Sequence, residues 1–193
     1  MWIMSKILIG YASHYGQTRK IAARIAATLE DRDHDVTMFD LAGPRQESPD
    51  GYDVVVLGSR VETGRHAPAF RAYVQAHRAK LAQRSTAMFS VSMAAAHPHA
   101  GTDPEGYIAK TCQELGWSPM RCASFAGGLP YRKYGWVTRL VMKTITKRAG
   151  GPTDTSRDHE LTHWDEVDTF AREIDALRVS EIITPVSTFV RPA

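Results

Sequence analysis

The chain has 193 residues, enough for one domain with a packed core. Its 43% hydrophobic and 23% charged residues exclude a largely disordered chain. The net charge of +3 is unevenly distributed, because six cations and no acids lie between residues 131 and 151; removing those six charges leaves the rest of the chain at −3. This asymmetry indicates a local basic surface for a partner and argues against nucleic-acid binding.

The first 11 residues are apolar but few, and Lys6 interrupts them. Without a small-residue cleavage site, they predict a first β-strand rather than a signal peptide. No uncharged apolar run approaches the roughly 20 residues that span a bilayer, so we expect any membrane contact to be peripheral. Cys112 and Cys122 lack the spacing of a metal site, and we expect reduced thiols in a cytoplasmic protein.

Strand-like apolar runs alternate with helical patterns along the chain. The predicted strands are residues 6–11, 36–41, 53–59, 86–92 and 121–127. The predicted helices are residues 17–31, 67–80, 105–115 and a last helix that opens with a capping box at Thr162–Asp165. This alternation predicts an α/β fold with a doubly wound, five-stranded parallel sheet. We expect one domain over residues 6–177 and a C-terminal tail at 178–193.

In such sheets, ligands bind beyond the carboxyl ends of the strands, where the strand order reverses. The loops expected there are residues 12–18, 60–66 and 93–101. The first contains Ser13-His14-Tyr15-Gly16-Gln17-Thr18, which offers hydroxyls and backbone N–H groups at a helix N-terminus, an anion-binding arrangement. It is neither a Walker A loop nor G-x-G-x-x-G. Its neutral donors suit a monophosphate, although the pattern alone equally fits a tight turn that caps the helix.

This loop resembles that of the flavodoxin family, which runs roughly Ser/Thr-x-Thr-Gly-x-Thr and binds the phosphate of FMN. Ser13, Gly16 and Thr18 match the pattern, and Tyr15 replaces a threonine. The resemblance implies a flavodoxin-like strand order of 2-1-3-4-5, FMN as cofactor, and residues 58–66 and 90–97 beside the isoalloxazine ring. The expected cofactor-binding residues are Ser13, His14, Tyr15, Gly16, Gln17, Thr18, Gly58, Ser59, Arg60, Ser90, Val91, Ser92, Met93, Ala94 and Asp154.

Residues 130–152 form a basic segment after the fifth strand, expected to be a helical insert. On a helical projection its cations share one side, and Trp136 and Leu140 fall on or beside that side. Such a surface suits lipid headgroups or an apolar ligand with carboxylates, and a solvated helix is the alternative. The candidate substrate or membrane residues are Tyr131, Arg132, Lys133, Trp136, Arg139, Leu140 and Lys143.

The insert, with "YASHYGQTRKIA", "GSRVETGRH" and "FSVSMAA", is similar to the flavodoxin-like, quinone-dependent protoporphyrinogen oxidases of bacteria. That resemblance implies FMN-dependent oxidation of protoporphyrinogen IX in haem biosynthesis. It also implies menaquinone or ubiquinone as acceptor and a peripheral place on the cytoplasmic side of the inner membrane.

Two alternatives on the same fold are an NAD(P)H-quinone reductase and an electron-carrier flavodoxin. The basic insert argues against the carrier, which is typically acidic. His66, His97 and Asp154 are candidates for a general base, although a solvent-facing position is the simpler interpretation of both histidines. Whether the chain forms a homo-oligomer is left open.

Overall fold

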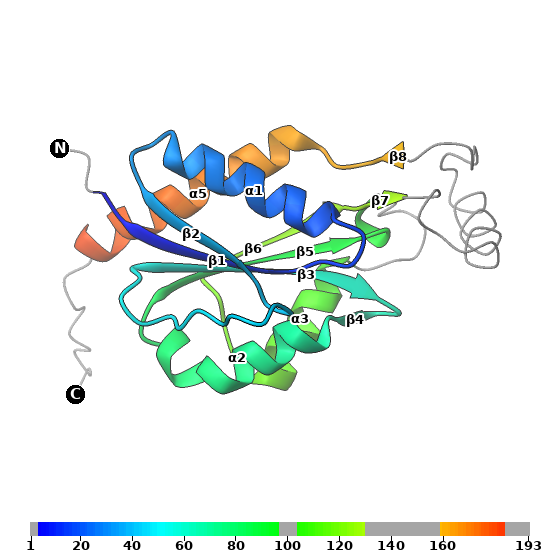
Figure 1. The fold of residues 1–193 in the computed structure, drawn as a ribbon, viewed down its shortest axis with the longest axis horizontal. Helices are drawn as coiled ribbons and strands as arrows, with labels where there is room; N and C mark the ends of the chain where they lie inside the picture. The colour runs from blue at the N-terminus through cyan, green and yellow to red at the C-terminus, as the bar shows by residue number, and fades with distance from the viewer. Residues whose placement is uncertain (1–3, 97–103, 130–158, 184–193) are drawn as a thin grey trace, which may run out of the picture.

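Five parallel strands form the middle layer of the computed structural model, which describes residues 4–96, 104–129 and 159–183 (Figure 1). Their order across the sheet is β2-β1-β3-β5-β6, which confirms the predicted doubly wound arrangement. The strands are β1 Lys6–Ala12, β2 Asp35–Asp40, β3 Val54–Glu62, β5 Ser85–Ser92 and β6 Arg121–Ala126.

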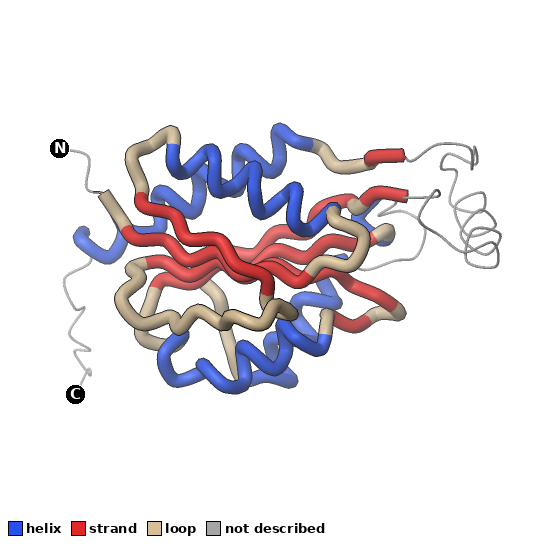
Figure 2. The backbone as a smooth tube through the Cα atoms, in the orientation of Figure 1, coloured by secondary structure: helices blue, strands red, loops and turns tan. Residues whose placement is uncertain are grey.

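Helices cover both faces of the sheet (Figures 1 and 2). α1 (Gln17–Glu30) and α5 (Trp164–Ile183) pack on one face, and α2 (Pro68–Leu81) and α3 (Pro104–Leu115) pack on the other. Residues 54–57 of β3 alternate between the two cores and are at most 1% exposed. A strand buried on both faces has no polar side, which is why this stretch is continuously apolar.

β3 is longer than its apolar run. It continues to Glu62, turns at Thr63 and Gly64, and returns as the short antiparallel strand β4 (Arg65–His66). Residues 60–66 are therefore mostly a β-hairpin, and the prediction of a plain loop there is wrong. Both turn residues have positive φ, +48° and +75°, as in a type I′ turn, whose twist matches that of the paired strands. A second unpredicted element is the 3₁₀ turn Ala94–Ala96.

The predicted capping box at Thr162 is also wrong. The Thr162 hydroxyl donates to the Ala126 carbonyl at 2.7 Å and accepts from Gln17 Nε2 at 2.8 Å, so it is not available to cap α5. At its other end α5 continues to Ile183, through the first residues of the expected tail. Residues 184–193 lie outside the described part of the chain.

Charged pairs fasten α5 to α1 and to the start of β2. Arg24 donates from Nε and Nη2 to the two carboxylate oxygens of Asp168, both at 2.7 Å, and these hydrogen bonds lower the pKa of Asp168. Asp175 accepts from Arg32 at 2.7 Å and lies 2.9 Å from His34 Nε2. The Ser5 N–H donates to His34 Nδ1, so the proton of the neutral ring lies on Nε2 and points at Asp175.

β7 (Gly128–Leu129) and β8 (His159–Glu160) form a separate antiparallel pair. Residues 130–158 connect these two strands, so that segment leaves and rejoins the fold at one place. The expected helical insert 130–152, its candidate residues and Asp154 lie outside the described residues. Within the three described stretches, no helix has both the length and the apolar character needed to cross a membrane.

Replacing Gly58 by alanine tests the packing of the sheet centre. A Cβ at Gly58 would lie 1.9 Å from Phe89 Cζ, and Phe89 is fully buried. We expect Gly58→Ala to lower the free energy of unfolding by about 2–3 kcal/mol, measured by urea denaturation, because the ring has nowhere to move. Gly127→Ala is the control, since its Cβ would meet nothing closer than 3.6 Å; equal losses in both variants would contradict this explanation.

The hairpin turn offers a stabilising substitution. Thr63 is β-branched and has φ +48°, a conformation that asparagine tolerates better, and Asn-Gly is the preferred type I′ pair. We expect Thr63→Asn to raise the free energy of unfolding by about 1 kcal/mol, measured in the same urea series. Thr63→Val, which keeps the branch, should give no gain. A Thr63→Asn protein no more stable than wild type would show that the turn is unstrained.

Candidate functional site

The turns after β1, β3 and β5 meet at the carboxyl edge of the sheet. β1 lies between β2 and β3, so the chain first adds a strand on one side of β1 and then adds the later strands on the other side. In open α/β sheets, ligands bind beside the strand at which this order reverses. Figure 1 shows the first turn, the β3–β4 hairpin and the β7–β8 pair gathered at this edge. The sequence expectation that these loops would lie together is confirmed.

The first turn leaves the N-terminus of α1 open. Gly16 is the residue before the helix, with φ +101°, and no side chain caps α1 there. A Cβ at Gly16 would meet nothing within 4 Å, so glycine is needed for its φ and not for close packing. Ser13 Oγ accepts from the Gly16 N–H at 3.1 Å, and Thr18 is buried in the first helical turn. Uncapped N–H groups and hydroxyls, with no Lys or Arg among residues 13–18, fit a single phosphate group.

Glu62 joins the hairpin to the first turn. Its carboxylate lies 3.0 Å from His14 Nδ1 and 2.9 Å from Arg60 Nε, and the His14 ring stacks on Tyr15 at 4.2 Å between centroids. Partial burial raises the pKa of Glu62, but hydrogen bonds from Arg60 and His14 outweigh this and lower it overall. Sequence reasoning missed Glu62, because a partner 48 residues away leaves no local pattern.

The segment after residue 158 is tied to the start of α1. The Gln17 amide donates to Thr162, so this candidate side chain is committed to the fold. Lys20 Nζ lies 2.8 Å from Glu160 Oε2, and Trp164 Nε1 donates to Glu160 Oε1 at 2.8 Å. The Lys20 hydrogen bond lowers the pKa of Glu160. The end of the segment that carries the basic insert is therefore anchored beside the phosphate-type turn.

Six candidate residues of the second and third loops lie inside strands: Gly58, Ser59, Arg60, Ser90, Val91 and Ser92. Gly58 is explained by the Phe89 ring packed against it rather than by approach to a ligand. Ser59 Oγ donates to the Arg60 carbonyl and accepts from the Ala67 N–H, both within the fold. Val91 is 5% exposed, and Ser90 is fully buried with its hydroxyl oxygen unpartnered.

The third turn itself is formed by residues 92–96. Ser92 Oγ accepts from the Ala95 N–H at 3.1 Å, and Met93 and Ala94 are half-buried in the turn. The turn follows directly on β5, two residues beyond Ser90 with its unpartnered hydroxyl.

His66 is not solvent-facing, contrary to the interpretation from sequence. It is 2% exposed, its Nδ1 lies 2.9 Å from Thr111 Oγ1, and its ring packs against Phe70. Burial, with the nearby Arg71, lowers the pKa of His66 to about 4, so the ring is neutral at pH 7. The other two candidates for a base, His97 and Asp154, lie outside the described residues.

Two curated proteins match most of the chain. The protoporphyrinogen IX dehydrogenase (quinone) of Escherichia coli K12 is 34% identical over 170 residues, covering 88% of this chain and 94% of that protein. The protein of the same name from Leishmania major is 30% identical over 174 residues, covering 89% and 75%.

Solved structures show the same fold. Oxidised flavodoxin 1 from Bacillus cereus superposes with a TM-score of 0.52 at 15% identity, covering 88% of this chain and 97% of that one. A flavodoxin from the domain Archaea gives 0.52 at 14% identity, covering 90% and 99%. At these identities the likeness extends to the fold alone.

Residues 8–156 match the sequence model of the family described as flavodoxin domain. This match and the two curated relatives confirm the resemblance seen in the motifs. The chain belongs to the flavodoxin-domain family and, within it, to the group of proteins named protoporphyrinogen IX dehydrogenase (quinone).

Proposed function

We propose that this protein binds FMN and oxidises protoporphyrinogen IX to protoporphyrin IX, with a membrane quinone as electron acceptor. The observation that carries the proposal is the uncapped N-terminus of α1 at Gly16, preceded by a turn without Lys or Arg, in a chain 34% identical to a protein named for this reaction. The fold is shared with flavodoxins, and the N-terminus of α1 has the donors that one phosphate monoester needs.

The described residues fit FMN. The N–H groups of the first turn of α1, the Ser13 hydroxyl and the buried Thr18 would hold its phosphate. The hairpin turn at Thr63–Gly64 and the turn at residues 92–96 would contact its ring, above the unpartnered Ser90 hydroxyl. When bound, FMN supplies a two-electron acceptor for hydride from the porphyrinogen and a reductant for the quinone.

The chain's own part in this reaction is to hold the ring loops in place. Glu62 pairs with His14 and with Arg60, which links the hairpin to the phosphate turn. Gln17 and Lys20 link the same turn to the segment at 160–164. These contacts support a loop arrangement that is present before FMN binds, which would reduce the ordering required on binding.

We also propose that residues 130–152 bring the protein to the cytoplasmic face of the inner membrane, where the quinone is dissolved. Six cations without an acid in this part of the chain support attraction to anionic lipid. The aromatic and aliphatic residues among them support shallow insertion. The anchoring of residues 160–164 on α1 connects this membrane contact to the flavin turn.

Anaerobic mixing tests the reaction. Protein loaded with FMN should lose its flavin absorbance when protoporphyrinogen IX is added, and a menaquinone analogue should restore it while porphyrin fluorescence rises. Bleaching by NADPH, with none by the porphyrinogen, would instead indicate the quinone-reductase alternative. A stable blue semiquinone on titration, with no porphyrin formed, would indicate an electron carrier.

Gly16→Ala tests the phosphate turn, because a Cβ disfavours the φ of +101° that opens the N-terminus of α1. We expect FMN to bind about tenfold more weakly, as for a strain of about 1–2 kcal/mol, measured by flavin fluorescence titration. Gly51→Ala is the matched control. Gly51 also has a positive φ, +82°, and an added Cβ there also meets nothing within 4 Å, but Gly51 precedes β3 and so lies away from the carboxyl edge of the sheet. Equal FMN affinity in both variants would place the phosphate elsewhere.

Charge removal tests the membrane contact. Changing Arg139, Lys143 and Lys147 to glutamine should weaken sedimentation with anionic vesicles about a hundredfold, at about 1 kcal/mol for each cation, while FMN stays bound. A control triple variant at the exposed residues Arg45, Lys110 and Arg172 makes the same change in net charge. Equal weakening in the two triple variants would mean that net charge, rather than the insert, drives the binding.

A further inference from the structure

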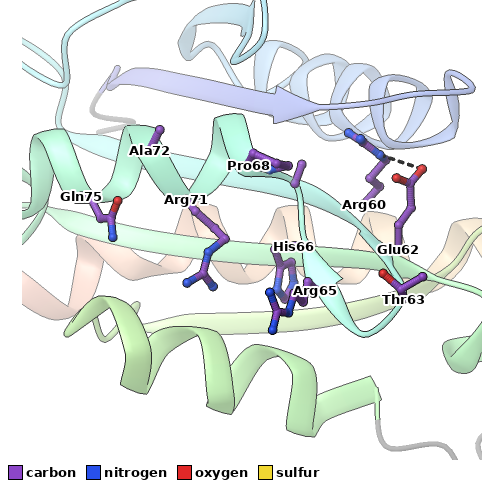
Figure 3. Close-up of a pocket in the computed structure, with 10 residues that line it drawn as sticks. Arg60, Glu62, Thr63, Arg65, His66, Pro68, Arg71, Ala72 and Gln75 are labelled. Atoms are coloured by element: carbon purple, nitrogen blue, oxygen red, sulfur yellow. Dashed lines mark ion pairs between the residues drawn. The ribbon is translucent and has the colours of Figure 1, made fainter.

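A pocket of about 440 Å³ lies between the β3–β4 hairpin and α2 (Figure 3). Thr63 and Arg65 line it from the hairpin, His66 from β4, and Pro68, Arg71 and Gln75 from α2. None of these residues from β4 or α2 is among those that would hold the FMN phosphate. The pocket shares Thr63, and hence the hairpin tip, with the proposed ring site.

Positive charge dominates the pocket. Arg65 is exposed and forms no ion pair with any residue that the structure describes. Arg71 Nη1 lies 2.8 Å from Glu114, which leaves its other two nitrogens as donors. Figure 3 shows these side chains on the same side of α2 as His66. Glu62, the acid in the lining, is already paired with Arg60 and His14.

The N-terminus of α2 adds to this charge. The helix begins at Pro68 beside the pocket, and no side chain caps it. Its first N–H groups carry the partial positive charge of the helix dipole. The pocket therefore combines two guanidinium groups with an open helix end, which suits an anion.

His66 supplies the second, independent indication of a ligand. The residue is 2% exposed, and its Nε2 has no hydrogen-bond partner among the described residues. The pair of His66 Nδ1 and Thr111 Oγ1 accommodates either tautomer, and an anion site uses the one in which the Thr111 hydroxyl donates and the ring proton lies on Nε2. A buried donor without an acceptor is destabilising, and His66 lines the pocket, where an anionic oxygen would pair with it.

We propose that this pocket binds a carboxylate arm of the porphyrinogen, with Arg65, Arg71 and His66 Nε2 as donors. The proposal rests on the proposed function, since it assigns a place to one propionate of that substrate. A planar carboxylate accepts two N–H bonds from a guanidinium group, so arginine is the residue type suited to it. A propionate held here leaves the apolar macrocycle at the hairpin tip, beside the ring site.

The test compares two stable ligands, protoporphyrin IX and its dimethyl ester, in which both carboxylates are masked. Binding to the FMN-loaded protein in detergent is followed by porphyrin fluorescence. We expect wild type to prefer the free acid, and Arg65→Gln/Arg71→Gln to reduce that preference at least about tenfold, as for loss of charge-assisted hydrogen bonds. The double variant should raise KM for protoporphyrinogen IX and leave kcat nearly unchanged, because the arm is far from the reacting carbons.

The matched control is Arg78→Gln/Arg172→Gln, which removes the same charge. Arg78 is on α2, two turns beyond Arg71, and neither residue lines the pocket. Retained FMN confirms that each variant is folded. The assignment of the pocket would be overturned if the preference for the free acid fell equally in both double variants. It would also be overturned if that preference fell in neither of them.

The proposed function is judged separately, by oxidation of protoporphyrinogen IX by the wild type. A wild type that prefers the acid through Arg65 and Arg71 but does not oxidise the porphyrinogen would contradict the function and not the pocket.

Discussion

The open N-terminus of α1 is the constraint on which the rest of the site depends. It exists because Gly16 adopts a φ of +101° and because no side chain takes the helix N–H groups. A serine or aspartate in the capping position would fill that space and remove the anion site. Around it, His14 is bonded to the hairpin, and Gln17 and Lys20 are bonded to the segment at 160–164. The hairpin and the segment at 160–164 thus meet at the helix end where the FMN phosphate is proposed to bind.

The pattern of apolar runs predicted the strands and the family resemblance implied their order, both of which the structure confirms, but neither indicated the hairpin. The continuous apolar stretch at residues 54–57 marks a strand buried on both faces, and the serine, glycine and threonine of the first turn directly follow the apolar strand that begins at Lys6. Residues 60–66 have no apolar alternation, and a β-branched residue at the first turn position argues against a type I′ turn. Partners such as Glu62 and His14 are 48 residues apart, so only the folded chain brings them together.

Some polar atoms near the site are buried without partners among the described residues. The Ser90 hydroxyl and His66 Nε2 lie where apolar groups would be more stable. Both lie near the carboxyl edge of the sheet, on strands or turns that border the proposed ring site. Thr111, by contrast, gives His66 Nδ1 a partner and fixes the ring. From sequence alone, a histidine after a strand gives no sign of its burial, and so its partners could not be foreseen.

The proposed carboxylate pocket and the strand pair that bounds the basic segment belong to different parts of the fold. The carboxylate pocket is on the face covered by α2 and α3, whereas residues 130–158 begin and end at the β7–β8 pair, which is tied to α1 through Glu160. A porphyrinogen has two propionates on a wide apolar disc. If Arg65 and Arg71 hold one of them, as proposed, the second propionate is left for cations elsewhere in the chain. Fixing one arm at a defined place would set the orientation of the macrocycle as well as its affinity.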